Sequence, residues 1–265
     1  MNIRPAAVAG YFYPADAVEL QTELGALIPP ASATVSAPAP LRALIVPHAG
    51  YRYSGVIAGA AYACLSAGAF QRVLLLGPAH RVALRGIAIP SVAAFDTPLG
   101  AIALDRAGLD SLRALPFVQQ RDDAHAKEHA LEVQLPFLQR QLGAFTLLPL
   151  VVGDCEPEQV AMVIEQFADA KTLIVISTDL SHFHSDAEAR VLDAETIAHI
   201  ENAEPMLEPE QACGAMPLNG FLYFLNQHSH GDGARGKPQL LRAGNSAEYG
   251  GPADRVVGYA SFCVH

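Results

Sequence analysis

Three apolar segments of this chain end in residues that can do chemistry. "RALIVPH" ends at His48, "LLLGPAH" ends at His80, and "TLIVISTDLSH" contains Asp179 and ends at His182. A single histidine after a strand more often packs or forms a hydrogen bond in a loop. Three such endings favour a different explanation, because a cluster of imidazoles is what a metal site requires. Their wide spacing matches no short zinc signature, so the fold must assemble the site.

The segment "KEHALE" offers further candidates for such a site. Glu128 and Glu132 fall on one helix face, and His129 forms an HxxE pair with Glu132. The segment lacks HExxH, which argues against a zincin-type protease. Two interpretations stay open for Glu128. Its negative charge can interact favourably with the positive end of the helix dipole at a solvated helix start. Alternatively, it can orient a ligand imidazole.

Cys213 is the cysteine whose surroundings indicate chemistry. It precedes a helix predicted at 217–228, and a helix N-terminus lowers the pKa of a thiol and favours the thiolate. A thiolate with two imidazoles would suit zinc, copper or iron. The other cysteines, Cys64, Cys155 and Cys263, are expected to be buried small apolar residues.

The elements that must position these residues alternate along the chain. Strands are predicted at 42–47, 72–77, 145–153, 172–178 and 255–264, with shorter strands in "GIAIP" and "GAIALD". Helices are predicted at about 16–27, 55–68, 128–143 with a bend at Pro136, 156–168, 186–203 and 217–228.

The strands "LLL", "LPLVV" and "LIVI" are apolar at every position, which is typical of strands buried on both faces. The sequence therefore predicts an α/β fold: one three-layer domain over 1–265, with a mixed, mostly parallel sheet flanked by helices. In such sheets, ligands bind beyond the carboxyl ends of the strands. The Pro- and Ala-rich stretch 28–41 is interpreted as a surface connector.

Composition excludes several classes of function. The chain has 265 residues and a formal net charge of −10, whereas a nucleic-acid-binding surface would be basic. We expect no membrane partner, since no apolar run approaches the roughly 20 residues of a membrane span. Reduced cysteines and the lack of a signal-peptide pattern favour a cytoplasmic location. No nucleotide cofactor is expected, because GxGxxG and Walker A loops are absent, as is a GxSxG elbow.

The chain resembles the Memo family, known in bacteria and archaea as the AmmeMemoRadiSam system protein B. The resemblance begins at "AGYFYP" and covers nearly the whole chain, and it is specific as an ensemble of motifs. The motifs, in order, are "PHAGYRYSG", "LLGPAH", "TPLG", "EHALEVQLPFL", "STDLSHFH", "CGAMPLNG" and "RVVGYASFCVH".

The resemblance implies a fold similar to the catalytic subunit of class III extradiol dioxygenases, the LigB-like type, whose members open catechol rings with non-haem iron. It also implies a metal site of two histidines and one cysteine, here His48, His80 and Cys213. Asp179 and His182 match polar residues of that site and are expected to be catalytic. The residues expected in the pocket or behind the ligands are His129, Glu128, Tyr51 and His184. The family name suggests functional association with a radical-SAM protein and an AMMECR1-like protein.

Three functions fit these expectations. The favoured one is a dioxygenase-like redox enzyme that uses iron(II) or copper on an unknown small substrate, with His182 as acid or base. Ring cleavage does not follow from the fold, because ring-opening dioxygenases use a carboxylate as third ligand. The second is a non-catalytic module that binds a peptide or protein. The third is hydrolysis by zinc-bound water, for which no HExxH-like base is found.

Overall fold

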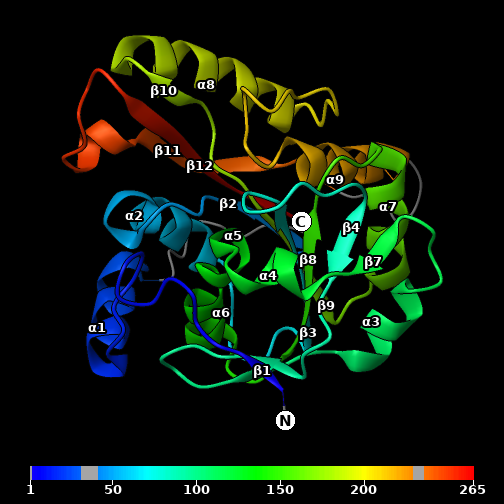
Figure 1. The fold of residues 1–265 in the computed structure, drawn as a ribbon. Helices are drawn as coiled ribbons and strands as arrows, with labels where there is room; N and C mark the ends of the chain where they lie inside the picture. The colour runs from blue at the N-terminus through cyan, green and yellow to red at the C-terminus, as the bar shows by residue number, and fades with distance from the viewer. Residues whose placement is uncertain (1, 31–40, 229–235) are drawn as a thin grey trace.

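A nine-stranded mixed sheet forms the centre of the molecule in the computed structural model (Figure 1), which describes residues 2–30, 41–228 and 236–265. Most of the connector expected at 28–41 therefore lies outside the described residues. The strand order is β10-β12-β2-β9-β3-β8-β4-β7, with β11 paired to β12. The strands are β2 (Ala43–Val46), β3 (Arg72–Pro78), β4 (Ile87–Ile89), β7 (Val118–Gln120), β8 (Thr146–Val152), β9 (Thr172–Ser177), β10 (His182–His184), β11 (Gln239–Asn245) and β12 (Val256–Val264).

The middle of this sheet is parallel. β9 lies between β2 and β3 and is parallel to both, and β3 is also parallel to β8. The register aligns Val46 with Ser177, and Leu76 with Ile176, so these strands end at one edge of the sheet. Every residue of β2 and β9 is buried, as the continuous apolar runs predicted. The α/β class with a mixed sheet is therefore confirmed.

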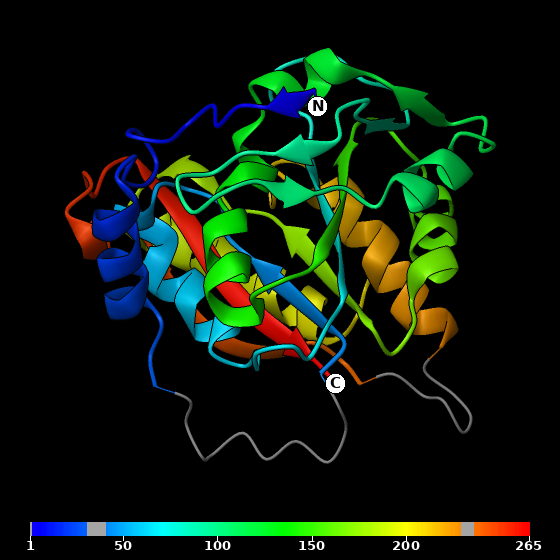
Figure 2. The ribbon, with the colours of Figure 1, turned by 90° about the horizontal axis from the view of Figure 1, so that it is seen from below.

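Helices cover both faces of the sheet (Figures 1 and 2). α1, α2 and α6 pack together on one face, and α7 and α9 pack together on the other. α2 and α8 contact β11 and β12 from opposite sides. The helices are α1 (Ala17–Leu27), α2 (Tyr51–Tyr62), α3 (Arg106–Leu112), α4 (Asp122–Ala126), α5 (His129–Glu132), α6 (Leu135–Leu142), α7 (Pro157–Phe167), α8 (Asp186–Glu201) and α9 (Ala215–Gln227).

A smaller, separate sheet of β1 (Ile3–Arg4), β5 (Ala94–Phe95) and β6 (Ile102–Ala103) contacts the large one where β6 meets β8. A short 3₁₀ helix, Ser246–Tyr249, follows β11. Within the part of the chain that the structure describes, no helix combines the length and apolar character needed to cross a bilayer.

The bounds of two predicted helices are wrong, and several short or exposed elements were not predicted. The helix expected at 128–143 is two helices, α5 and α6. Pro136 lies in the first turn of α6, where its missing N–H leaves no helical hydrogen bond unmade. The helix expected at 55–68 begins at Tyr51 and ends at Tyr62. β10 and β11 were not predicted, because their side chains are largely exposed and form neither a continuous nor an alternating apolar pattern.

Candidate metal centre

His48 follows β2 and is held from two directions. Its backbone N–H donates to Asp179 Oδ1 at 2.7 Å, and its Nδ1 lies 2.9 Å from Ser177 Oγ. The Ser177 hydroxyl donates its proton to the Ala130 carbonyl and accepts a proton from Gln134 Nε2. A hydroxyl has one proton to donate, so Ser177 must accept the proton of His48 Nδ1. His48 Nε2 therefore keeps its lone pair and can bind a metal.

His80 follows β3 and is fixed by one carboxylate. Glu128 accepts the His80 Nδ1 proton at 2.9 Å through Oε1 and the His80 backbone N–H at 2.7 Å through Oε2. Burial opposes ionisation of Glu128, but the hydrogen bond and charge of His80 outweigh it and lower the pKa of Glu128 to about 2. Glu128 is 1% exposed and caps α5. It therefore orients an imidazole and is not part of a solvated helix start.

Cys213 reaches the same point from the segment before α9. Its Sγ lies 3.2 Å from His48 Nε2 and accepts the Asp179 backbone N–H at 3.3 Å. The Cys213 backbone N–H donates in return to the Asp179 carbonyl. Gly214 allows this approach, since a Cβ there would lie 2.8 Å from the Ser177 carbonyl oxygen.

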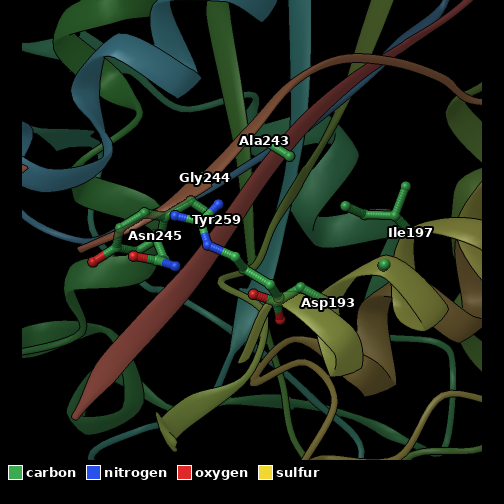
Figure 3. Close-up of a pocket in the computed structure, with 8 residues that line it drawn as sticks. Asp193, Ile197, Ala243, Gly244, Asn245 and Tyr259 are labelled. Atoms are coloured by element: carbon green, nitrogen blue, oxygen red, sulfur yellow. The ribbon is translucent and has the colours of Figure 1, made fainter. Parts of the chain in front are cut away.

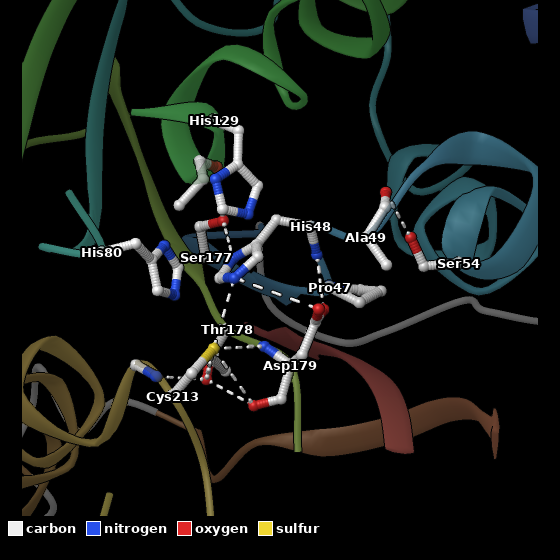
Figure 4. A network of polar contacts seen from close by, with 12 residues as sticks. Pro47, His48, Ala49, Ser54, His80, His129, Ser177, Thr178, Asp179 and Cys213 are labelled. Atoms are coloured by element: carbon white, nitrogen blue, oxygen red, sulfur yellow. Dashed lines mark hydrogen bonds and ion pairs between the residues drawn. The ribbon is translucent and has the colours of Figure 1, made fainter. Parts of the chain in front are cut away.

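Three ligand atoms thus converge in space (Figure 4). One atom each from His48, His80 and Cys213 lies within 4.8 Å of the other two. Typical Zn–N and Zn–S bond lengths at a tetrahedral angle place N and S about 3.5 Å apart. The 3.2 Å between His48 Nε2 and Cys213 Sγ is close to that value. The donor set and its spacing therefore fit a single transition-metal ion.

The protonation expected of Cys213 from sequence is wrong for the metal-free chain. Burial raises the pKa of the thiol above its ordinary range, and the Asp179 carboxylate raises it further. The predicted helix dipole does not offset these effects. A thiolate at this position needs a cation beside it, and a bound metal ion would supply that charge.

His129 forms a wall of the same site. Its ring stacks on His80 with centroids 4.7 Å apart and lies 5.4 Å from the His48 ring. Phe12 packs on His129 at 4.8 Å, and Glu128 Oε1 lies 3.4 Å from His129 Nδ1. Burial and His48 lower the pKa of His129 to about 4, so it is neutral near pH 7. His129 also belongs to a second possible ligand group with His80 and Glu128.

Asp179 lies on the loop after β9, and His182 is the first residue of β10. Asp179 is 4% exposed, and its Oδ2 lies 4.0 Å from His48 Nε2. His182 Nδ1 donates to the Leu180 carbonyl at 2.8 Å, so its Nε2 keeps the lone pair. His182 also interacts electrostatically with His48 and Asp179. Both residues are therefore near the cluster, and their catalytic role stays a prediction.

Two expected pocket residues are placed elsewhere. Tyr51 is buried in the core, and its hydroxyl donates to the Val133 carbonyl at 2.8 Å. Tyr51 follows "PHAG" directly in the sequence, but its side chain packs in the core. His184 interacts electrostatically with Glu188 and Asp193, on the α8 side of the loop.

Sequence reasoning missed the polar residues behind the ligands. Ser177 and Gln134 hold His48, and Thr178 accepts the Gly214 N–H and donates to the Asp179 carbonyl. A polar residue inside an otherwise apolar buried strand was the available signal for Ser177. No such signal marked Gln134, because a glutamine within a predicted helix looks like an exposed residue.

The cysteine expectations hold in part. Cys155 and Cys263 are buried, whereas Cys64 is partly exposed.

A separate cavity of about 250 Å³ lies between α8 and the β11–β12 pair (Figure 3). Asp193 and Ile197 of α8 line it together with Asn245 and Tyr259. The Asp193 carboxylate accepts the Ser181 N–H at 3.0 Å and so supports the loop between β9 and β10, which carries Asp179. The proposed ligands do not line this cavity.

The fold and this cluster define a class of protein. A family sequence model described as "Memo-like protein" matches residues 4–263. A "MEMO1 family protein" of Ignicoccus hospitalis is 32% identical over 98% of each chain. Another, of Aquifex aeolicus, is 37% identical over 76% of this chain and 75% of its own. The chain belongs to the Memo family.

The fold has a relative among solved structures. The crystal structure of uncharacterized protein JW3007 from Escherichia coli K12 aligns with a TM-score of 0.52 at 13% identity. The alignment covers 85% of this chain and 100% of that chain. The likeness shows a shared α/β fold and says nothing of activity.

Proposed function

We propose that this Memo-family chain binds one redox metal ion, iron(II) or copper, through His48 Nε2, His80 Nε2 and Cys213 Sγ, and oxidises a small substrate beside it. The observation that supports the proposal is that one ligand atom from each of these three residues lies within 4.8 Å of the other two. Iron and copper suit a mixed imidazole and thiolate site, and zinc fits the same ligand types. A bound iron or copper ion would supply electron transfer and open positions for an oxidant and a substrate.

The protein's own groups orient the ligands and move protons. Ser177 and Glu128 hold the two imidazoles with Nε2 toward the cluster. The Nδ1 of His182 donates its proton to the Leu180 carbonyl, so in the neutral ring the lone pair is on Nε2. It can therefore accept a proton from a substrate hydroxyl or amine. His129 and Phe12 form an aromatic wall that keeps water from one side of the ligands.

A second candidate function is a peptide-binding module, favoured by one exposed aromatic residue. Phe183 is 61% exposed and has a φ of 66°, a left-handed conformation that is costly for a side chain of this size. The Arg255 guanidinium lies 4.4 Å from its ring centroid. A strained aromatic residue next to His182 could contact an apolar group of a partner peptide.

Paired measurements separate the two functions. Metal stoichiometry and O₂ consumption are measured on protein purified anaerobically and loaded with Fe(II) or Cu(I), for wild type, His48→Ala and His182→Ala. His48→Ala should lose the metal, because two remaining ligands rarely hold such an ion. His182→Ala should keep the metal and lose about 10²-fold in O₂ consumption. The matched control is His228→Ala, at a surface histidine paired with Glu165.

Two results would contradict the redox proposal. Full metal content in His48→Ala would show that the ligands are wrong. O₂ consumption in His182→Ala equal to that of wild type would remove His182 from the chemistry. If no metal-dependent reaction occurs in any form, and peptide affinity survives metal removal, the binding module is the better description.

A further inference from the structure

The cavity between α8 and the β11–β12 pair is lined by a buried acid (Figure 3). Asp193 is 7% exposed, although carboxylates are rarely buried without a partner. Its Oδ1 accepts the Ser181 N–H at 3.0 Å. Arg190 lines the same cavity, but its ion pairs are with Asp186 at 3.0 Å and Glu248 at 3.1 Å. Within the described ranges, Asp193 therefore has no lysine or arginine as an ion-pair partner.

The surroundings of this cavity are acidic. Arg190 is the cationic side chain of its lining, and it lies between the carboxylates of Asp186 and Glu248. Glu248 is next to the lining at Gly244, where a Cβ would lie 2.8 Å from Glu248 Oε2. With Asp193, three negative charges thus surround one positive charge. The cavity and its rim should attract a cation.

Burial makes the charge of Asp193 costly. It raises the pKa of the carboxyl group, whereas the hydrogen bonding of Ser181 and the charges of His182 and His184 oppose the rise. A buried charge without a partner of opposite sign destabilises a protein. A cation held beside the carboxylate would remove this cost, so binding would gain more there than at an exposed acid.

The rest of the lining limits the size and polarity of a ligand. The cavity measures about 250 Å³, whereas sites for drug-sized molecules measure about 300–1,000 Å³. Ala194, Ile197 and Ala243 contribute apolar side chains, and Tyr259 contributes an aromatic residue that is 2% exposed. Aromatic rings attract organic cations. The lining therefore suits a small apolar molecule that carries one ammonium group.

We propose that this cavity binds a small organic ammonium ion, whose charged group pairs with Asp193 and whose apolar part packs against Ile197 and Tyr259. The proposed metal ligands do not line the cavity, so binding does not require a metal ion. Asp193 also accepts the Ser181 N–H. A cation beside the carboxylate weakens that hydrogen bond, and the Ser181 amide therefore reports on binding.

The test measures the affinity of the full-length chain for phenethylammonium by calorimetric titration, with and without chelator. 2-Phenylethanol has the same shape with a neutral hydroxyl, and phenylacetate carries the opposite charge. Phenethylammonium should bind at least about 10-fold more tightly than 2-phenylethanol, because hydrogen bonds to charged groups are the stronger ones. Phenylacetate should not bind. The Ser181 amide signal should shift in NMR spectra during the phenethylammonium titration, and chelator should change none of these results.

Substitutions locate the site. Asp193→Asn keeps the shape and an acceptor for Ser181 but removes the charge, so affinity for phenethylammonium should fall by about 10- to 100-fold while that for 2-phenylethanol stays the same. Ala194→Phe, at an exposed position of α8, should fill the cavity and prevent binding of both probes. This second variant leaves the support of the loop by Asp193 intact.

The matched control is Glu195→Gln, which removes an exposed negative charge of α8 outside the cavity lining. It should bind phenethylammonium as wild type does. Equal affinity of wild type for phenethylammonium and 2-phenylethanol would overturn the proposal. Wild-type affinity for phenethylammonium in Asp193→Asn or in Ala194→Phe would also overturn it.

Discussion

A buried serine hydroxyl decides which nitrogen of His48 faces the cluster. Ser177 Oγ donates once, to Ala130, and accepts from Gln134 and His48. The imidazole needs no metal to select this tautomer. The lone pair at His48 Nε2 is therefore in place before an ion arrives, and binding need not reorganise it.

Ser177→Ala tests this orientation. The substitution leaves the His48 Nδ1–H without its acceptor, so the ring loses its preferred orientation. Metal affinity should fall by about 10- to 100-fold, measured by competition with a chelator of known affinity. The matched control is Ser261→Ala, at a buried serine whose hydroxyl has no hydrogen-bond partner among the described residues. Equal loss in both variants would point to a general packing effect.

Glu128→Gln tests the charge and the acceptor capacity behind His80. Both carboxylate oxygens accept protons, from His80 Nδ1 and Ala130 N at Oε1 and from His80 N at Oε2. A glutamine must present its NH₂ group to one of these donors, so this near-isosteric change breaks the arrangement. Metal affinity should again fall by about 10- to 100-fold. In the exposed control Glu158→Gln, the same titration should give the wild-type value.

The sequence indicated the strand-end residues of the site but not the residues that orient them. His48, His80 and Asp179 follow apolar strands directly, so a parallel sheet was enough to predict that they meet. The family resemblance was needed to link Cys213 to them. The roles of Gln134 and Tyr51 could not be predicted, because each depends on which face of a helix packs against which loop.

At the scale of elements, the end of α1 lies in close contact with α2 at Gly59. A Cβ on Gly59 would lie 2.1 Å from the Leu27 carbonyl oxygen at the end of α1. The absence of a side chain at Gly59 therefore allows the end of α1 to rest on α2. Because α2 begins three residues after His48, this contact also stabilises the segment between His48 and α2.

Gly59→Ala should destabilise the fold through that contact. Overpacking of this kind typically costs about 1–3 kcal/mol, and the midpoint of urea unfolding should fall accordingly. Gly25→Ala, in the last turn of α1, is the matched control. Its Cβ would meet nothing closer than an Arg140 nitrogen at 3.7 Å. That variant should gain up to about 1 kcal/mol from helix propensity, and a loss of stability there would contradict the explanation.

The elements themselves were predictable to different degrees. Apolar runs at 72–77 and 172–178 predicted β3 and β9 within a residue, because both faces of these strands are covered. β10 and β11 were missed because they are exposed strands beside β12, held by backbone pairing and not by buried side chains. Hydrophobic pattern carries no signal for such strands.

At the scale of the whole molecule, buried neutral imidazoles make stability depend on pH. Burial lowers the pKa of His125 to about 4, although its Nε2 is bonded to the Ala88 carbonyl. The unfolded chain has an ordinary histidine pKa near 6.5 and takes up a proton first as the pH falls. The contribution of neutral His125 to the free energy of unfolding is therefore fully present above about pH 6.5. It is lost progressively as the pH falls toward 4.

His125→Gln should remove part of this dependence. Between about pH 7.5 and 5, wild type should lose on the order of 2 kcal/mol through this residue alone, and the glutamine variant should not. Urea unfolding of the metal-free protein at both pH values measures the difference. An unchanged pH dependence in His125→Gln would mean that other groups, such as His129, account for the loss.

The place of β12 in the sheet has a consequence for synthesis on the ribosome. β12 is inserted between β10 and β2, and it pairs with β2 through Phe262 and Ile45. A nascent chain that has reached Cys213 holds all three proposed ligands while this edge of β2 still lacks its neighbour. Unpaired strand edges invite association with other chains. Ribosome-bound chains arrested before residue 256 should therefore bind holdase chaperones, and chains extended past residue 265 by a linker should release them.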